Sequence, residues 1–129
     1  MQGTPLPGQT MTFEPAPSAV PAARSFVRKA SQSCDTQDLE LLVSEVASNA
    51  ILHARSAFTV SVIPLADGIR IEVGDHDSRL PQPLALDPSR ANGRGLLILE
   101  ALARSWGTRA TSTGKVVWFE LGSTPGAVP

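Results

Sequence analysis

The spacing of apolar residues predicts three helices in this chain. After Asp35, a good helix-capping residue, apolar side chains recur at helical intervals as far as position 54, which predicts an amphipathic helix of about five turns. A shorter apolar stripe follows Ser18, a plausible N-cap, and predicts a helix over 18–31. Helical spacing returns after Gly95 and predicts a third helix that ends near Ser105.

Strand-forming residues, mostly in apolar–polar alternation, predict a sheet. The predicted strands are 11–14, 58–62, 69–74, 108–112 and 115–121. Asp67-Gly68 and Thr113-Gly114 join the last four into two hairpins. The order of elements predicts an α+β fold, a two-layer α/β sandwich in which helices pack on one face of a mixed, mostly antiparallel sheet.

Length and composition favour one domain. The 129 residues are 42% hydrophobic, which is enough for a real core. We expect the domain to cover 10–121, with loose ends at 1–9 and 122–129 because both are rich in glycine and proline. Three prolines forbid most regular structure in 76–92, and a loop of that length is usually functional or disordered.

Charge and cysteine content narrow the function and the location. A net charge of −1 without a basic run argues against a nucleic-acid partner, since phosphate neutralisation supplies most of that affinity. The single cysteine, Cys34, excludes an internal disulfide and fits a cytoplasmic protein. No signal peptide and no apolar run of about 20 residues is present, so we expect no membrane contact.

Polar residues at three places could form a ligand site. Glu45 and Asn49 lie one turn apart on the predicted long helix, where a carboxylate and an amide oxygen can share Mg²⁺ with phosphate oxygens and the carboxylate can act as a base. Asp75 ends a strand and can accept hydrogen bonds from a ligand amine. Ordinary polar residues at a helix edge and a turn residue that satisfies backbone amides are the alternatives, and both stay open.

The third place is Gly93-Arg94-Gly95, directly before a helix. Glycines let the backbone approach a ligand, the exposed N–H groups of a helix start favour anions, and Arg94 adds positive charge suited to phosphate. The alternative, a flexible junction between loop and helix, also stays open.

In this order the motifs resemble the nucleotide-binding boxes of the GHKL superfamily of ATPases and kinases. The motifs are EVASNAILHA at 45–54, Asp75 with Pro81 downstream, and Gly93-Arg94-Gly95-Leu96. Together with Trp106-Gly107 and GKVVWF at 114–119, they look most like the anti-sigma-factor serine/threonine kinase group and its actinobacterial relatives. The resemblance covers roughly 20–121 and implies the Bergerat ATP-binding fold.

The resemblance implies ATP and Mg²⁺ as ligands and a role for each matching residue. Asn49 would hold Mg²⁺, and Glu45 would be the base that activates an acceptor serine and would reach the metal through water. Asp75 would accept a hydrogen bond from the adenine amino group, with the hydroxyl of Thr113 nearby. Residues of the last box would fold over the phosphates, with 76–92 as a lid: Gly93, Arg94, Gly95 and Leu96. His53 also matches the family, but its place in the apolar stripe favours packing.

The chain departs from the family in the box that usually has the pattern Asp-x-Gly-x-Gly. Here it is Asp75-His76-Asp77-Ser78-Arg79, without glycine. The missing glycines stiffen the backbone beside the adenine and add charge there. His76, Asp77 and Arg79 are either a catalytic cluster or solvated loop residues.

The resemblance implies a kinase that phosphorylates an anti-sigma-factor antagonist, sequesters a sigma factor, or does both, as a homodimer. The altered box supports an alternative, a non-catalytic protein-interaction module that responds to nucleotide. A detached catalytic domain of a sensor kinase is a weaker alternative, because the chain has no dimerising helical segment with a phospho-acceptor histidine.

Overall fold

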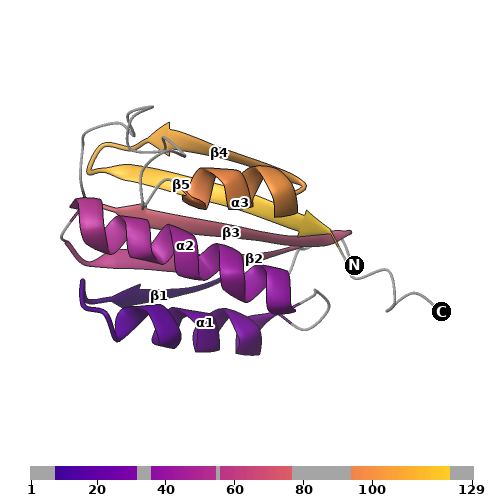
Figure 1. Ribbon diagram of the computed structural model, residues 1–129, viewed down its shortest axis with the longest axis horizontal. Coiled ribbons are helices and arrows are strands. Elements are labelled where there is room, and N and C mark those ends of the chain that lie inside the picture. Colours follow the sequence, from indigo (N-terminus) through magenta and orange to yellow (C-terminus); the bar gives the residue numbers. More distant parts are fainter. Residues whose placement is uncertain (1–7, 32–35, 55, 77–93, 123–129) are drawn as a thin grey trace.

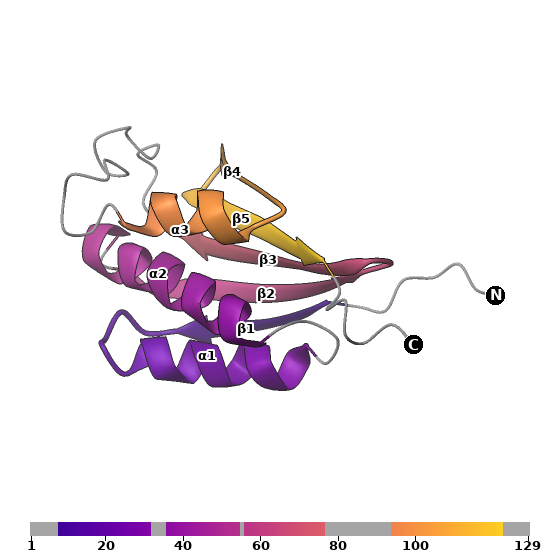
Figure 2. The ribbon, with the colours of Figure 1, turned by 45° about the vertical axis from the view of Figure 1, so that its right-hand side comes forward.

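Five strands form one antiparallel sheet, and helices cover one of its faces (Figure 1). The computed structural model describes residues 8–31, 36–54, 56–76 and 94–122. The strands are β1 (Gln9–Phe13), β2 (Phe58–Leu65), β3 (Gly68–Asp75), β4 (Ser105–Ala110) and β5 (Lys115–Gly122), in the spatial order β1-β2-β3-β5-β4. The helices are α1 (Ala19–Ala30), α2 (Thr36–Ala54) and α3 (Arg94–Leu102). The turned view shows the predicted two layers (Figure 2).

The sheet corrects one detail of the predicted fold, because every described strand pair is antiparallel rather than mixed. Helices α1 and α2 connect β1 to β2, and β2 runs antiparallel to β1. Helix α3 lies between β3 and β4 in the described part of the chain, and these two strands run in the same direction. They are not neighbours because β5 lies between them.

A second correction concerns the predicted third helix, which ends at Leu102 rather than near Ser105. Ser105 and Trp106 instead begin β4, where Trp106 pairs with Phe119 and packs against the core. The backbone N–H of Arg104 donates to the carbonyl of Glu120 at 2.8 Å. Sheet pairing and burial of an indole ring therefore outweigh the helical spacing of this segment.

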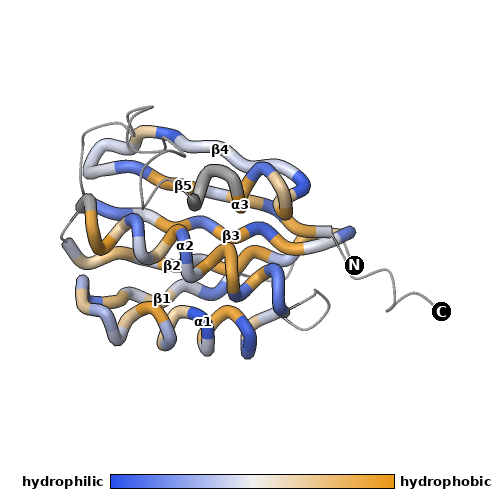
Figure 3. Tube along the Cα trace, in the orientation of Figure 1, coloured by the Kyte–Doolittle hydropathy of each residue, from blue (hydrophilic) through white to orange (hydrophobic). Residues whose placement is uncertain are grey.

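Helix α2 forms the centre of the core. Its predicted apolar stripe is confirmed, since the buried residues of α2 are Leu39, Leu42, Val43, Val46, Ala47 and Ala50. They belong to one cluster with the inward residues of the sheet, including Val60, Ile71 and Phe119. Figure 3 shows hydrophobic positions recurring along α2 and alternating along β3. Each Val, Leu, Ile or Phe side chain of this core contributes about 1.5–3 kcal/mol when fully buried.

The opposite face of the sheet is polar and is held by ion pairs between strands. Arg70 contacts Glu72 at 2.8 Å and Glu120 at 3.0 Å, and its guanidinium lies 4.1 Å from the ring centroid of Trp118. Burial opposes the ionisation of Glu120, but hydrogen bonds from Arg70 and Arg104 outweigh it and hold the pKa of Glu120 below its ordinary value. Burial likewise opposes the ionisation of Glu72, but hydrogen bonds from Arg70 and Arg109 outweigh it and hold the pKa of Glu72 below its ordinary value, so both carboxylates are stabilised in their charged form.

Two neighbouring leucines of α2 test the assignment of the core. Leu42 is fully buried, whereas the side chain of Leu41 is 44% exposed. We predict that Leu42→Ala lowers the free energy of unfolding by about 2–5 kcal/mol because it leaves a cavity beneath α2. Leu41→Ala is the matched control and should change it by about 0.5 kcal/mol or less. Urea denaturation measures both, and equal losses would contradict this packing.

Candidate nucleotide-binding site

The C-terminal half of α2 carries the predicted metal and base residues. Glu45 and Asn49 are both half-buried, and they flank the buried pair Val46 and Ala47. They lie one turn apart at the border of the apolar stripe, so they present a carboxylate and an amide at the edge of the core. This is the position that the helical spacing predicts, while their roles stay a prediction.

Asp75 ends the inward-facing row of β3. Successive side chains of a strand point to opposite faces, so Asp75 faces the helices together with Ile71 and Val73. The residue is only 7% exposed. Strand β3 thus brings a carboxylate to the helical side of the sheet, at the point where its apolar row stops.

The strand register brings Asn49 and Asp75 to the same end of the sandwich. Helix α2 ends close to the start of β2, and that start pairs with the end of β3, with Thr59 opposite Gly74. The backbone N–H of the exposed His76 donates to the hydroxyl of Ser56, in the α2–β2 connection, at 3.3 Å. The α2–β2 connection and the end of β3 are therefore in direct contact.

The start of α3 lies toward this end as well. Helix α3 is followed by β4, whose first residue, Ser105, pairs with Glu120 near the far end of β5. The N-terminus of α3 therefore lies toward the end of the sheet where β3 ends (Figure 1). The described residues do not include Gly93 or the part of the predicted lid 76–92 that follows His76. Asp77 and Arg79 belong to that part. The side chains of His53, Arg94 and Leu96, and the surroundings of Gly95, also lie outside the description.

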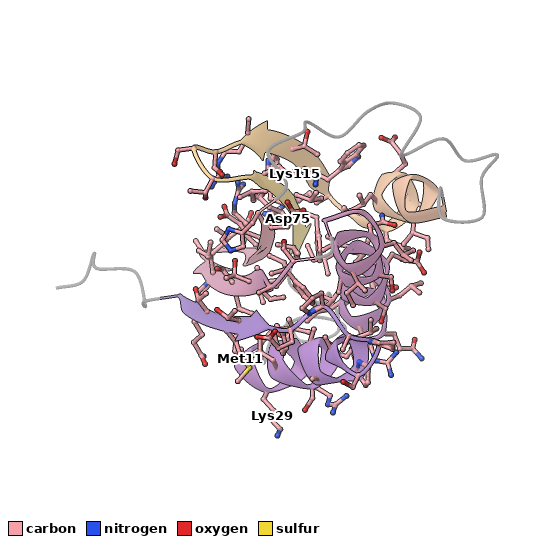
Figure 4. All side chains as sticks on the ribbon, turned by 90° about the vertical axis from the view of Figure 1, so that its left-hand side faces the viewer. Met11, Lys29, Asp75 and Lys115 are labelled. Carbon is pink, nitrogen blue, oxygen red and sulfur yellow. The ribbon has the colours of Figure 1, made fainter. Side chains whose placement is uncertain are left out.

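An ion pair that the sequence analysis missed holds Asp75. The Nζ atom of Lys115, the first residue of β5, lies 2.9 Å from Oδ2 of Asp75, and the two residues are direct partners in the sheet register. Their side chains are 11% and 4% exposed. Figure 4, which looks onto this end of the molecule, shows them side by side. One signal was available, since Lys115 occupies an inward position in alternation with Val117 and Phe119.

The β4–β5 turn packs directly against the end of β3. A Cβ atom added at Gly114 would overlap the carbonyl oxygen of Asp75, so only glycine allows this approach. The backbone N–H of Gly114 donates to the hydroxyl of Thr111 at 2.9 Å, which fixes the turn. Thr113, the predicted hydroxyl near the adenine, is exposed and adjoins Gly114. The structure thus places this turn next to Asp75.

The residues present fit ATP and Mg²⁺. Asp75 offers an acceptor for an amino group. Asn49 and Glu45 offer the oxygen atoms that Mg²⁺ prefers, and this ion takes few protein ligands because it keeps water and phosphate oxygens.

The two-layer fold is that of a GHKL-type domain. Residues 13–121 match the model of the histidine kinase-like ATPase domain, and the chain belongs to this family. Domains of this family generally bind ATP with Mg²⁺. None of the curated proteins matches the chain. Within the described residues, no helix is long and apolar enough to cross a membrane.

Thirteen chains of solved structures also match. One is described as the histidine kinase domain from Erythrobacter litoralis EL346 blue-light activated histidine kinase, with 22% identity and a TM-score of 0.52. The match covers 68% of this chain and 44% of that one, so the chain spans less than half the length of this relative. At this identity the likeness shows the fold.

The ion pair at the end of β3 has a measurable energy. We predict that Asp75→Ala lowers the free energy of unfolding by about 3 kcal/mol, because it leaves the Lys115 ammonium buried without its carboxylate. The double variant Asp75→Ala/Lys115→Met should recover part of this loss, because no charge then remains buried. Urea denaturation of the four proteins of the cycle checks this, and strictly additive losses would show that the pair is not coupled.

Proposed function

We propose that this chain binds Mg²⁺-ATP and phosphorylates a serine or threonine of a protein partner, an anti-sigma-factor antagonist. The observation that carries the proposal is the convergence of Asn49 and Asp75 at one end of a histidine kinase-like ATPase domain. The resemblance to the anti-sigma-factor kinase group supplies the class of partner.

Each residue of the site has one task in this proposal. Asp75 accepts a hydrogen bond from the adenine amino group, and Thr113 contributes a hydroxyl from the adjoining turn. The amide oxygen of Asn49 holds Mg²⁺ against the triphosphate. Gly93, Arg94, Gly95 and Leu96 close over the phosphates, where backbone N–H groups and the guanidinium offset negative charge.

Glu45 is the proposed catalytic base. Its carboxylate takes the proton of the acceptor hydroxyl while that oxygen bonds to the γ-phosphorus, and the bond from phosphorus to the ADP oxygen breaks. Positioning and charge do most of the work in phosphoryl transfer. The half-buried place of Glu45, one turn from Asn49, supports this role because both side chains then reach the same phosphate region.

Partner binding completes the proposed function. A kinase of this group would also sequester a sigma factor through an outer surface of the domain, would act in the cytoplasm and would form a homodimer. These three features rest on the resemblance alone.

The alternative function is a module that binds a protein partner and responds to nucleotide without phosphoryl transfer. The observation in its favour is the ion pair that already engages the Asp75 carboxylate. The box without glycines after Asp75 favours the same alternative.

Calorimetric titration with ATP, with and without Mg²⁺, tests nucleotide binding. We predict micromolar, Mg²⁺-dependent affinity, on the order of −8 kcal/mol. Asn49→Ala should remove the Mg²⁺ dependence and weaken binding at least about tenfold, since one ligand of the ion is lost. Ser48→Ala, at the neighbouring half-buried position of α2, is the matched control and should bind as the wild type does. Unchanged affinity in Asn49→Ala would remove Asn49 from the site.

Transfer of ³²P from labelled ATP to the cognate antagonist tests the base. We predict that Glu45→Gln leaves ATP affinity unchanged and slows transfer by about 10²–10⁴-fold, the usual contribution of a general base. Glu40→Gln is the matched control on the same helix, because Glu40 pairs with Arg28 at 3.2 Å, away from the site. Undiminished transfer by Glu45→Gln would contradict its role, and absence of transfer in the wild type would favour the non-catalytic module.

A further inference from the structure

The ion pair between Asp75 and Lys115 bears on which nucleotide base the site accepts. This question rests on the proposed nucleotide binding at Asp75. The carboxylate offers only acceptors, and the ammonium offers only donors. The two atoms that meet, Oδ2 and Nζ, are 2.9 Å apart. The carboxylate and the ammonium therefore lie side by side at the end of β3.

The register fixes this juxtaposition. Asp75 and Lys115 are opposite residues of β3 and β5, and both face the helical side of the sheet. The close approach of Gly114 to the Asp75 backbone holds the two strand ends together. Side-chain exposures of 4% and 11% keep most water away, so a polar atom placed there must find its partner within the protein.

Purine bases differ in the polar group at position 6. Adenine carries an amino group, which donates, and hypoxanthine and guanine carry an oxygen, which accepts. A lone carboxylate satisfies the amino group and repels the oxygen. With an ammonium beside the carboxylate, the amino group donates to Asp75, whereas the oxygen accepts from Lys115.

We propose that Lys115 is a specificity-determining residue that makes the site accept 6-amino and 6-oxo purine nucleotides alike. Asp75 serves the first class and Lys115 serves the second. The ion pair therefore sets a broader base selectivity than an isolated carboxylate at the end of β3 would have.

Calorimetric titration with ATP and with ITP tests this inference. ITP is the probe because its base differs from adenine in having oxygen at position 6 and a proton on N1. For the wild type we expect the two dissociation constants to agree within about tenfold. In Lys115→Met the ITP affinity should fall at least about tenfold more than the ATP affinity, because the oxygen then faces the carboxylate without a donor.

Two further variants make the result specific. Lys115→Arg keeps a charged donor and should keep the wild-type ratio of affinities. Lys29→Met is the matched control, because Lys29 is the only other lysine of the sequence and is exposed on α1, far from the pair in Figure 4. It should alter neither affinity.

The outcomes separate this inference from the proposed function. Binding of ATP with ITP weaker by more than about tenfold would overturn the inference and leave ATP binding intact. Equal weakening of both nucleotides in Lys115→Met would also overturn it, because Lys115 would then act through the structure of the site alone. If neither nucleotide binds to the wild type, both proposals fail. If Lys115→Met does not fold, the ratio of the ATP and ITP affinities in the wild type and in Lys115→Arg tests the inference instead.

Discussion

The packing of the α2 apolar stripe on the inner face of the sheet is the contact on which the rest of the structure depends. Leu42, Val43 and Val46 bury against inward residues of β2, β3 and β5, so α2 cannot rotate without exposing them. That same rotation fixes where Glu45 and Asn49 lie, at the border of the stripe. A hydrophobic contact therefore determines the position of the polar residues that the proposed chemistry needs.

At the end of β3 the apolar core gives way to the polar residues of the proposed site. The inward row of β3 is apolar until its last residue, where a carboxylate replaces the aliphatic side chains. A buried carboxylate is costly unless it is paired, and Lys115 supplies the pair from the neighbouring strand. The polar face on the other side of the sheet has its own ion pairs and no direct part in this site. The domain thus keeps its proposed ligand chemistry on the helical side.

Membership in the histidine kinase-like ATPase family and the arrangement of Asn49 and Asp75 are compatible with both proposed functions. A kinase needs the Glu45 carboxylate beside the triphosphate, and a nucleotide-responsive module does not. The Asp75–Lys115 pair bears on either function, because base recognition precedes any phosphoryl transfer.

The sequence by itself determined the element order, the apolar stripe of α2 and the strand-end position of Asp75, because these follow from local periodicity. It also pointed to the Glu45–Asn49 spacing, which one helix contains. Tertiary structure alone decided that β5 inserts between β3 and β4, and that Ser105 joins a strand rather than a helix. The tertiary structure alone also paired Asp75 with Lys115. Residues 40 positions apart meet only through the strand register, and no local sequence pattern fixes that register.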